Sequence, residues 1–124
     1  MMRYVWVGAG GFAGAIARYA VDGFVSNRAR GSFPWGTFVV NVSGAFLLGL
    51  IFAVLTERYL PHPAARLALT TGFLGAYTTF STYMFETMRL AEGGAKWMAA
   101  GNIIAGVAAG LVAIVAGTWL GRSL

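Results

Sequence analysis

The 124-residue sequence contains no cysteine, one histidine and three prolines, and charged residues make up only 10% of it. Without cysteine, the chain forms neither disulfides nor thiolate metal sites. The single histidine, His62, stands between two prolines and has no second histidine with which to share a metal. No pair of acidic residues is placed for proton transfer. We therefore do not expect an enzyme.

Apolar residues are abundant instead, at 58% of the chain with a mean hydropathy of +0.70. Four apolar stretches, 4–20, 34–55, 67–88 and 97–120, are each long enough to cross about 30 Å of hydrocarbon. Because a backbone in lipid must satisfy its own hydrogen bonds, and because these stretches are too long for barrel strands, they are expected to be helices. The sequence predicts an all-α membrane protein with four transmembrane helices and a single domain, 1–124.

The net charge is +5, but the basic residues are spread over the exposed segments and form no patch. We therefore expect the chain to contact a lipid bilayer and not nucleic acid. Lysine and arginine are normally more numerous in the loops on the cytoplasmic side of a membrane than in those on the other side, and this difference fixes the orientation of the chain. Here the counts on the two sides are equal, which predicts insertion in both orientations; a modest bias hidden by a misassigned residue is the alternative. One side carries Arg28, Arg30, Arg89 and Lys96, and the other carries Arg3, Arg58, Arg66 and Arg122.

The first stretch also resembles a signal peptide, because "MMR" precedes an apolar run that ends in "AIA" before Arg18. Since three further spans follow, we expect the segment to be retained as the first helix. Glycines at small-x-x-x-small spacing predict close helix packing. These pairs are Gly10 and Gly14, Gly106 and Gly110, and Gly117 and Gly121.

The second span places Thr37, Asn41 and Gly44 on one helical face. An amide in hydrocarbon is costly unless it is paired, so Asn41 either bonds a neighbouring helix or lines a wet path. An amide suits an anion path because it donates two hydrogen bonds without a fixed charge that would trap the ion.

The third span, "TTGFLGAYTTFSTYMFE" (70–86), is rich in hydroxyls, and two glycines precede the densest group. Glycine and β-branched threonine weaken a helix, and a break would free carbonyl oxygens that suit a dehydrated cation such as Na⁺. The alternative is an unbroken helix whose hydroxyls bond to the preceding turn. The residues concerned are Gly72, Gly75, Thr78, Thr79, Ser81 and Thr82.

Aromatic and charged residues near this span also have two interpretations each. Phe80 and Tyr83 share a face, which is most often simple packing, although ring edges can offer weak coordination to a small anion. Glu86 is expected to cap the helix, to pair with Arg89, or to lie at the membrane edge. Arg18 either pairs with Asp22 or concentrates anions in a vestibule.

Three segments, "GGFAGAIARY" (10–19), "WGTFVVNVSGAFLLG" (35–49) and "GFLGAYTTFSTYMFE" (72–86), give the chain a close resemblance to the Fluc family, also called CrcB. Members of this family are small bacterial and archaeal fluoride channels. The resemblance implies a dual-topology antiparallel homodimer in the plasma membrane, with two antiparallel pores and a third helix broken near mid-membrane. It also implies a central structural Na⁺ and multi-pass insertion.

The resemblance assigns Asn41 as the pore amide, Phe80 as the first pore aromatic, and Ser81 and Thr82 as nearby hydroxyls. Thr37, on the Asn41 face, is grouped with them. The activity that the resemblance implies is passive, selective electrodiffusion of F⁻ out of the cell, which relieves fluoride toxicity. Selectivity would come from a narrow path whose Asn, Thr and Ser donors and aromatic edges replace the hydration of the small ion.

The main-chain carbonyls of Gly75 and Thr78 would hold the sodium, and Arg18 would lie in the aqueous vestibule. Tyr83 stands where the family has a second pore phenylalanine, so its hydroxyl would either donate to the anion or narrow the path. The fourth helix lacks the family's tyrosine and serine track, which leaves Asn102 as a secondary candidate.

Two other classes compete with a fluoride channel. A small dual-topology multidrug exporter would need a glutamate in the first span, and this chain has none there. A non-transporting membrane assembly subunit would use the glycine faces and need no polar third helix. Within the channel class, the departures at Tyr83 and in the fourth helix leave room for a paralogous partner chain.

Overall fold

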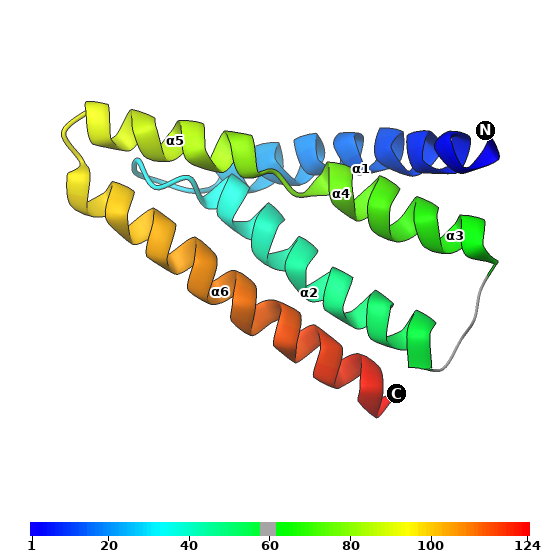
Figure 1. Cartoon of the computed structure of the whole chain (residues 1–124). Coiled ribbons are helices and arrows are strands. Elements are labelled where there is room, and N and C mark those ends of the chain that lie inside the picture. The colour runs from blue at the N-terminus through cyan, green and yellow to red at the C-terminus, as the bar shows by residue number, and fades with distance from the viewer. Residues whose placement is uncertain (58–61) are drawn as a thin grey trace.

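The computed structural model describes residues 1–57 and 62–124, and all regular secondary structure in these ranges is helical (Figure 1). The expectation of an all-α fold is confirmed. Successive long helical segments run in alternating directions, and both termini lie toward the end of the molecule where α3 begins. In chain order the elements are α1 (Met2–Ser26), α2 (Trp35–Glu57), α3 (Pro63–Leu67), the π-helical segment η1 (Ala68–Leu74), α4 (Gly75–Tyr77), α5 (Phe80–Glu92) and α6 (Lys96–Ser123).

Two of these helices, α2 and α6, are long and apolar enough to cross a membrane by length and composition. Many large apolar side chains point outward, among them Phe12, Trp97 and Val112, which are 72%, 92% and 69% exposed. Such a surface suits lipid and not water. The fold is therefore that of a membrane protein. Arg58, one of the cations in the charge comparison, lies outside the described residues.

The first helix is longer than the apolar stretch 4–20 from which it was predicted, because it continues to Ser26. No proline or positive-φ glycine interrupts it there, and the Ser26 hydroxyl donates to the Asp22 carboxylate at 3.0 Å, one turn earlier. The true turns contain Gly31 and Gly94, whose φ angles of 85° and 88° are ones that only glycine adopts readily.

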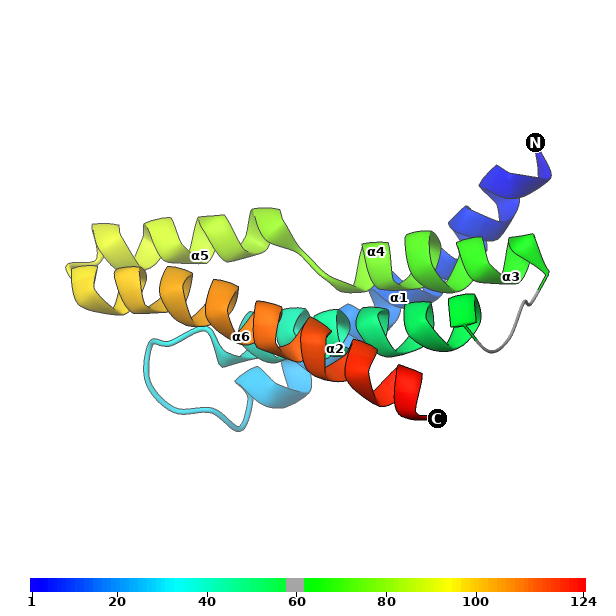
Figure 2. The same cartoon turned by 60° about the horizontal axis from the view of Figure 1, so that its bottom comes forward.

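The third helical segment begins at Pro63, where the His62 side chain accepts a hydrogen bond from the Ala64 amide at 3.3 Å. It passes through η1 and α4 and then stops being helical at Thr78 and Thr79. Their ψ angles of 154° and 118° are extended, and Figure 2 shows the stretched link between α4 and α5. The first half of the segment packs mainly against α1 and the second half mainly against α6, and both also contact α2.

Packing between helices relies on glycine. A side chain on Gly10 or Gly14 of α1 would overlap the backbone carbonyls of Ala68 and Phe73 in η1. On α6, Gly117 lies against the Phe46 carbonyl of α2 in the same way, and Gly121 lies against Ala53. These two glycine pairs let helices pack closely, as their spacing predicted. The prediction is wrong for the third pair, because Gly106 lies against the Tyr83 side chain and Gly110 has nothing within 4 Å.

Candidate functional site

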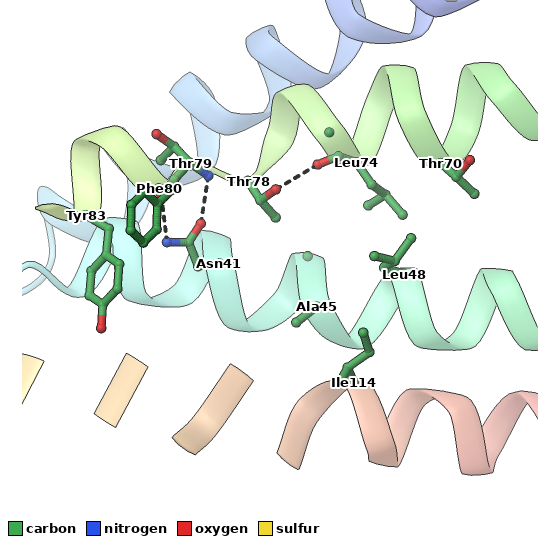
Figure 3. Close-up of a pocket in the computed structure, with 12 residues that line it drawn as sticks. Asn41, Ala45, Leu48, Thr70, Leu74, Thr78, Thr79, Phe80, Tyr83 and Ile114 are labelled. Carbon is green, nitrogen blue, oxygen red and sulfur yellow. Dashed lines mark hydrogen bonds between the residues drawn. The ribbon is translucent and has the colours of Figure 1, made fainter. Parts of the chain in front are cut away.

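Asn41 of α2 binds the backbone of the interrupted segment through both ends of its amide. Its Oδ1 accepts from the Thr79 N–H at 2.8 Å, and its Nδ2 donates to the Thr79 carbonyl at 3.0 Å (Figure 3). Thr79 is only 8% exposed, so without this partner two buried backbone groups would be unpaired. The Asn41–Thr79 pair thus stabilises the extended backbone at the interruption.

The interruption also leaves carbonyl oxygens without the N–H partners that a continuous helix would give them, and those of Gly75 and Thr78 are among them. In a continuous helix the Gly75 carbonyl would accept from the Thr79 N–H, but that N–H donates to Asn41. The Thr78 carbonyl would accept from the Thr82 N–H, which instead donates to the Thr79 hydroxyl at 3.3 Å as the N-cap of α5. Both carbonyls lose their helical partner, and they belong to the two residues for which sequence resemblance implies sodium binding.

A cavity of about 370 Å³ opens beside the interruption, and most of the candidate residues from α2 and the third segment line it. Phe80 stands at its edge with 74% of its surface exposed, although it is a large apolar residue. Its ring meets that of Tyr83 edge to face, with centroids 6.3 Å apart. The lining residues are Asn41, Gly44, Ala45, Leu48, Thr70, Leu74, Gly75, Thr78, Thr79, Phe80, Tyr83 and Ile114 (Figure 3).

A second cavity, of about 200 Å³, shares Thr79 with the first and is more polar. Arg18 and Asp22 of α1 line it together with Thr37 of α2 and Thr82 of α5. Asp22 accepts a hydrogen bond from Ser26. Within the described residues no ion pair joins Arg18 to Asp22, although both line this cavity.

Thr37 connects this second cavity to Glu86. The Thr37 hydroxyl donates to Glu86 Oε1 at 2.9 Å, while the buried Oε2 has no hydrogen-bond partner. Of the three roles expected for Glu86, the structure shows none directly and adds a fourth, a hydrogen bond to α2. The carboxylate is thereby held on the α2 side of α5.

Tyr83, Thr87 and Asn102 form a closed set of hydrogen bonds between α5 and α6. The Tyr83 hydroxyl donates to the Asn102 carbonyl at 2.9 Å, Asn102 Nδ2 donates to the Thr87 hydroxyl at 2.9 Å, and that hydroxyl donates to the Tyr83 carbonyl at 2.8 Å. Asn102 is 1% exposed. It lies in the α5–α6 contact and lines neither of the two cavities described above.

The structure thus groups the candidate residues into two cavities and one helix contact. Ser81 is exposed, and its hydroxyl lies 3.5 Å from that of Thr79. Sequence reasoning grouped Thr79 with the hydroxyls of the third span but gave it no role of its own, and it did not single out Thr87. An N-cap threonine followed by helix-compatible residues is a usable signal for Thr79, whereas nothing in the sequence connects Thr87 to Asn102.

Fold and site together define a small helical membrane protein whose third helical segment is interrupted. Asn41 and several threonines line one cavity beside the interruption, and Arg18 and Asp22 line the second. Residues 5–118 match the family described as "CrcB-like protein, Camphor Resistance (CrcB)". The chain belongs to this family, so the resemblance seen in the three segments is confirmed.

Curated relatives match over nearly their whole length. "Fluoride-specific ion channel FluC" of Solibacter usitatus (strain Ellin6076) is 44% identical over 121 residues, covering 98% of this chain and 99% of the relative. "Fluoride-specific ion channel FluC 1" of Streptomyces avermitilis is 46% identical over 123 residues, covering 99% and 98%. The Geobacter sulfurreducens protein named "Fluoride-specific ion channel FluC" is 48% identical over 111 residues, covering 90% and 86%.

Proposed function

We propose that this chain is a fluoride-selective passive ion channel that lets F⁻ leave the cytoplasm and so relieves fluoride toxicity. The observation that carries the proposal is membership of the CrcB family, with end-to-end relatives named as fluoride-specific ion channels. Passive conduction makes and breaks no covalent bond, so the protein is not an enzyme.

The donors beside the interruption support an anion as the transported ion. Asn41 Nδ2 carries two N–H groups and uses one for the Thr79 carbonyl, so the other is available to an anion. The Thr82 hydroxyl accepts from the Thr79 hydroxyl at 3.0 Å and keeps its own proton to donate. These donors carry no charge, and a small anion can therefore exchange water for them without being trapped.

Thr37 and Arg18 have different roles in this proposal. The Thr37 hydroxyl donates its hydrogen bond to Glu86, which orients that carboxylate. The Thr37 oxygen can then act only as a hydrogen-bond acceptor. Arg18, in the same cavity as Thr82, raises the local anion concentration at the vestibule without binding the ion tightly. Ser81 and the exposed Phe80 complete the proposed path, with the Phe80 ring edge as a weak anion contact.

The proposed assembly is an antiparallel homodimer with two antiparallel pores, formed by four-span chains that insert in both orientations in the plasma membrane. The balanced charges of the loops support dual insertion. An exposed Phe80 at the edge of a large cavity is a feature that a second copy would cover. The interruption would then lie near mid-membrane, close to the two-fold axis.

A structural Na⁺ fits the carbonyl groups of Gly75 and Thr78, because both have lost their helical hydrogen-bond partners. Hard monovalent cations prefer oxygen ligands, and unpaired carbonyls in lipid need a partner. When bound, the ion would supply positive charge that offsets the carbonyl dipoles at the interruption. Exchange of Na⁺ for a bulky organic cation during purification is expected to lower the dimer's thermal stability; equal stability in both cations contradicts the site.

The deciding experiment measures F⁻ efflux from liposomes that contain the purified protein, with a fluoride electrode. We expect F⁻ efflux and little Cl⁻ efflux, and the Phe80→Leu variant is expected to form dimers but to release F⁻ at least about tenfold more slowly. Equal efflux of the two anions contradicts the proposal. An assembly subunit would give no flux of either ion, and a multidrug exporter would give proton-coupled flux of organic cations instead.

A further inference from the structure

The hydroxyl of Tyr83 points away from Asn41, on the opposite side of the cavity of about 370 Å³ that both residues line (Figure 3). Figure 3 shows the phenol ring extending from α5 toward α6, with its oxygen at the end remote from Asn41. That oxygen lies 2.9 Å from the Asn102 carbonyl and 2.7 Å from the Ile103 carbonyl. A phenol has one proton, and both nearest acceptors belong to the α6 backbone.

The ring occupies a space that exists because residue 106 is glycine. A Cβ on Gly106 would lie 2.7 Å from Tyr83 Cζ and 3.0 Å from Cε2, and it would also meet the hydroxyl oxygen. Real Cβ atoms do not come so close to ring atoms, so any larger residue at 106 must displace the ring. Neighbouring Gly101 and Gly110 on the same helix have nothing within 4 Å.

We propose that Tyr83 and Gly106 form a complementary pair in which Tyr83 is a positioning residue. Its hydroxyl is fixed to the α6 backbone, its ring fills the space left by Gly106, and an anion in the cavity meets ring carbon and not the hydroxyl. The pair therefore sets the separation of α5 from α6 and fixes the ring against which Phe80 packs edge to face.

This inference rests on the proposed fluoride conduction, but its packing part can be measured without any ion flux. Two further hydrogen bonds tie the same place together, because the Thr87 hydroxyl accepts from Asn102 Nδ2 and donates to the Tyr83 carbonyl. Tyr83 is 9% exposed, so its position is fixed within the fold and does not depend on a partner chain.

The test compares Gly106→Ala with the matched control Gly110→Ala, each alone and combined with Tyr83→Leu. Thermal unfolding in detergent and F⁻ and Cl⁻ efflux from liposomes are measured for each protein. We expect Gly106→Ala to lower Tm by about 5 °C or more and efflux by about tenfold, and Gly110→Ala to match the parent. Tyr83→Leu is expected to destabilise the parent but to restore part of the lost Tm in the Gly106→Ala background.

Tyr83→Phe tests the direction of the hydroxyl. Loss of the bond to α6 is expected to lower Tm by a few degrees and slow F⁻ efflux about two- to threefold, with the F⁻ to Cl⁻ ratio of the parent. A changed ratio, or a loss of more than about tenfold at unchanged Tm, means that the hydroxyl acts on the ion and overturns the inference.

The pairing itself is overturned if Gly106→Ala behaves like Gly110→Ala, or if the effects of Gly106→Ala and Tyr83→Leu on Tm simply add. If the parent protein passes no F⁻, the proposed function fails, while the Tm values still decide whether Tyr83 and Gly106 are paired. The two failures are thus distinguishable.

Discussion

Helix α6 makes two contacts of opposite character, one with α2 and one with α5. Against α2 it presents Gly117 and Gly121. On the α2 side lies Gly49, where a Cβ would overlap the Ile114 carbonyl and lie 2.8 Å from the Thr118 hydroxyl oxygen. Against α5 it presents Asn102 and two backbone carbonyls, which receive hydrogen bonds. The first contact is dry and close, and the second is polar and directional.

The difference shows how a small membrane protein divides two tasks between two faces of one helix. Lipid removes the usual hydrophobic drive for helix association, so close packing of small residues and interhelical hydrogen bonds must replace it. Glycine packing holds α2 and α6 together without orienting any particular side chain. The hydrogen bonds to α5 fix one ring, that of Tyr83, beside the interruption.

Breaking the glycine contact is expected to have the largest effect. Gly117→Leu would place a side chain into the Phe46 carbonyl, a backbone atom that cannot move without moving α2. We expect the free energy of unfolding to fall by about 4–5 kcal/mol, which is enough to prevent recovery of folded protein. Gel filtration in detergent measures this, with Gly110→Leu as the control; a monodisperse Gly117→Leu protein contradicts the prediction.

Removal of the Asn41 amide is expected to come second. Asn41→Ala leaves the buried N–H and carbonyl of Thr79 without their partner, which costs about 2–4 kcal/mol. We expect a lower denaturation midpoint together with loss of F⁻ efflux. Asn41→Asp provides the control, because a carboxylate still accepts from the Thr79 N–H but cannot donate to the Thr79 carbonyl. The denaturation midpoint of Asn41→Asp should therefore lie between those of the parent and of Asn41→Ala.

A smaller effect is expected in the polar contact of α6. Asn102→Ala removes one hydrogen bond to Thr87, and interhelical hydrogen bonds in membranes are worth about 0.6–2 kcal/mol each. Tm should fall modestly, and the F⁻ to Cl⁻ ratio should remain that of the parent if Asn102 acts between helices. A changed ratio would return Asn102 to the ion path.

The smallest effect is expected at the ion pair between α2 and α6. Arg122 Nε lies 2.9 Å from Glu57 Oε1, but the two side chains are 63% and 43% exposed. Exposed pairs contribute at most about 1 kcal/mol and are screened by salt. Glu57→Gln should therefore change Tm by less than Asn102→Ala does, and a larger change would show that this end of the contact matters more than its glycines.

The helical fold was predictable because hydropathy and length leave few alternatives in lipid. The lengths of the helices were less predictable. Helix α1 extends beyond its apolar stretch to Ser26, and the Ser26 hydroxyl donates a hydrogen bond to Asp22 in this extension. The π-helical form of η1 left no signal in the sequence, because nothing in "ALTTGFL" (68–74) distinguishes a π-helix from an α-helix. Hydropathy reports which residues avoid water but not the helical pitch.

At the candidate site, sequence reasoning identified Asn41 but left its role open between a helix contact and a wet path. The partner of Asn41 is a backbone amide 38 positions away, and backbone groups carry no sequence signal. The direction of the Tyr83 hydroxyl depends on the absence of a side chain at Gly106. The sequence does not show which two residues of α5 and α6 face each other, so this direction was not predictable. Asn102 shows the same limit, and its part in the ion path stays a prediction.

The extended link at Thr78 and Thr79 has an electrostatic consequence. An uninterrupted helix would have its partial charges only at its two ends, far apart. Here the negative end of the α3–η1–α4 stretch and the positive end of α5 face each other across two residues. One segment therefore presents helix ends of both signs close together within the fold, so its backbone dipoles alone would favour a cation at one end and an anion at the other, in addition to the charge of Arg18 in the adjoining cavity.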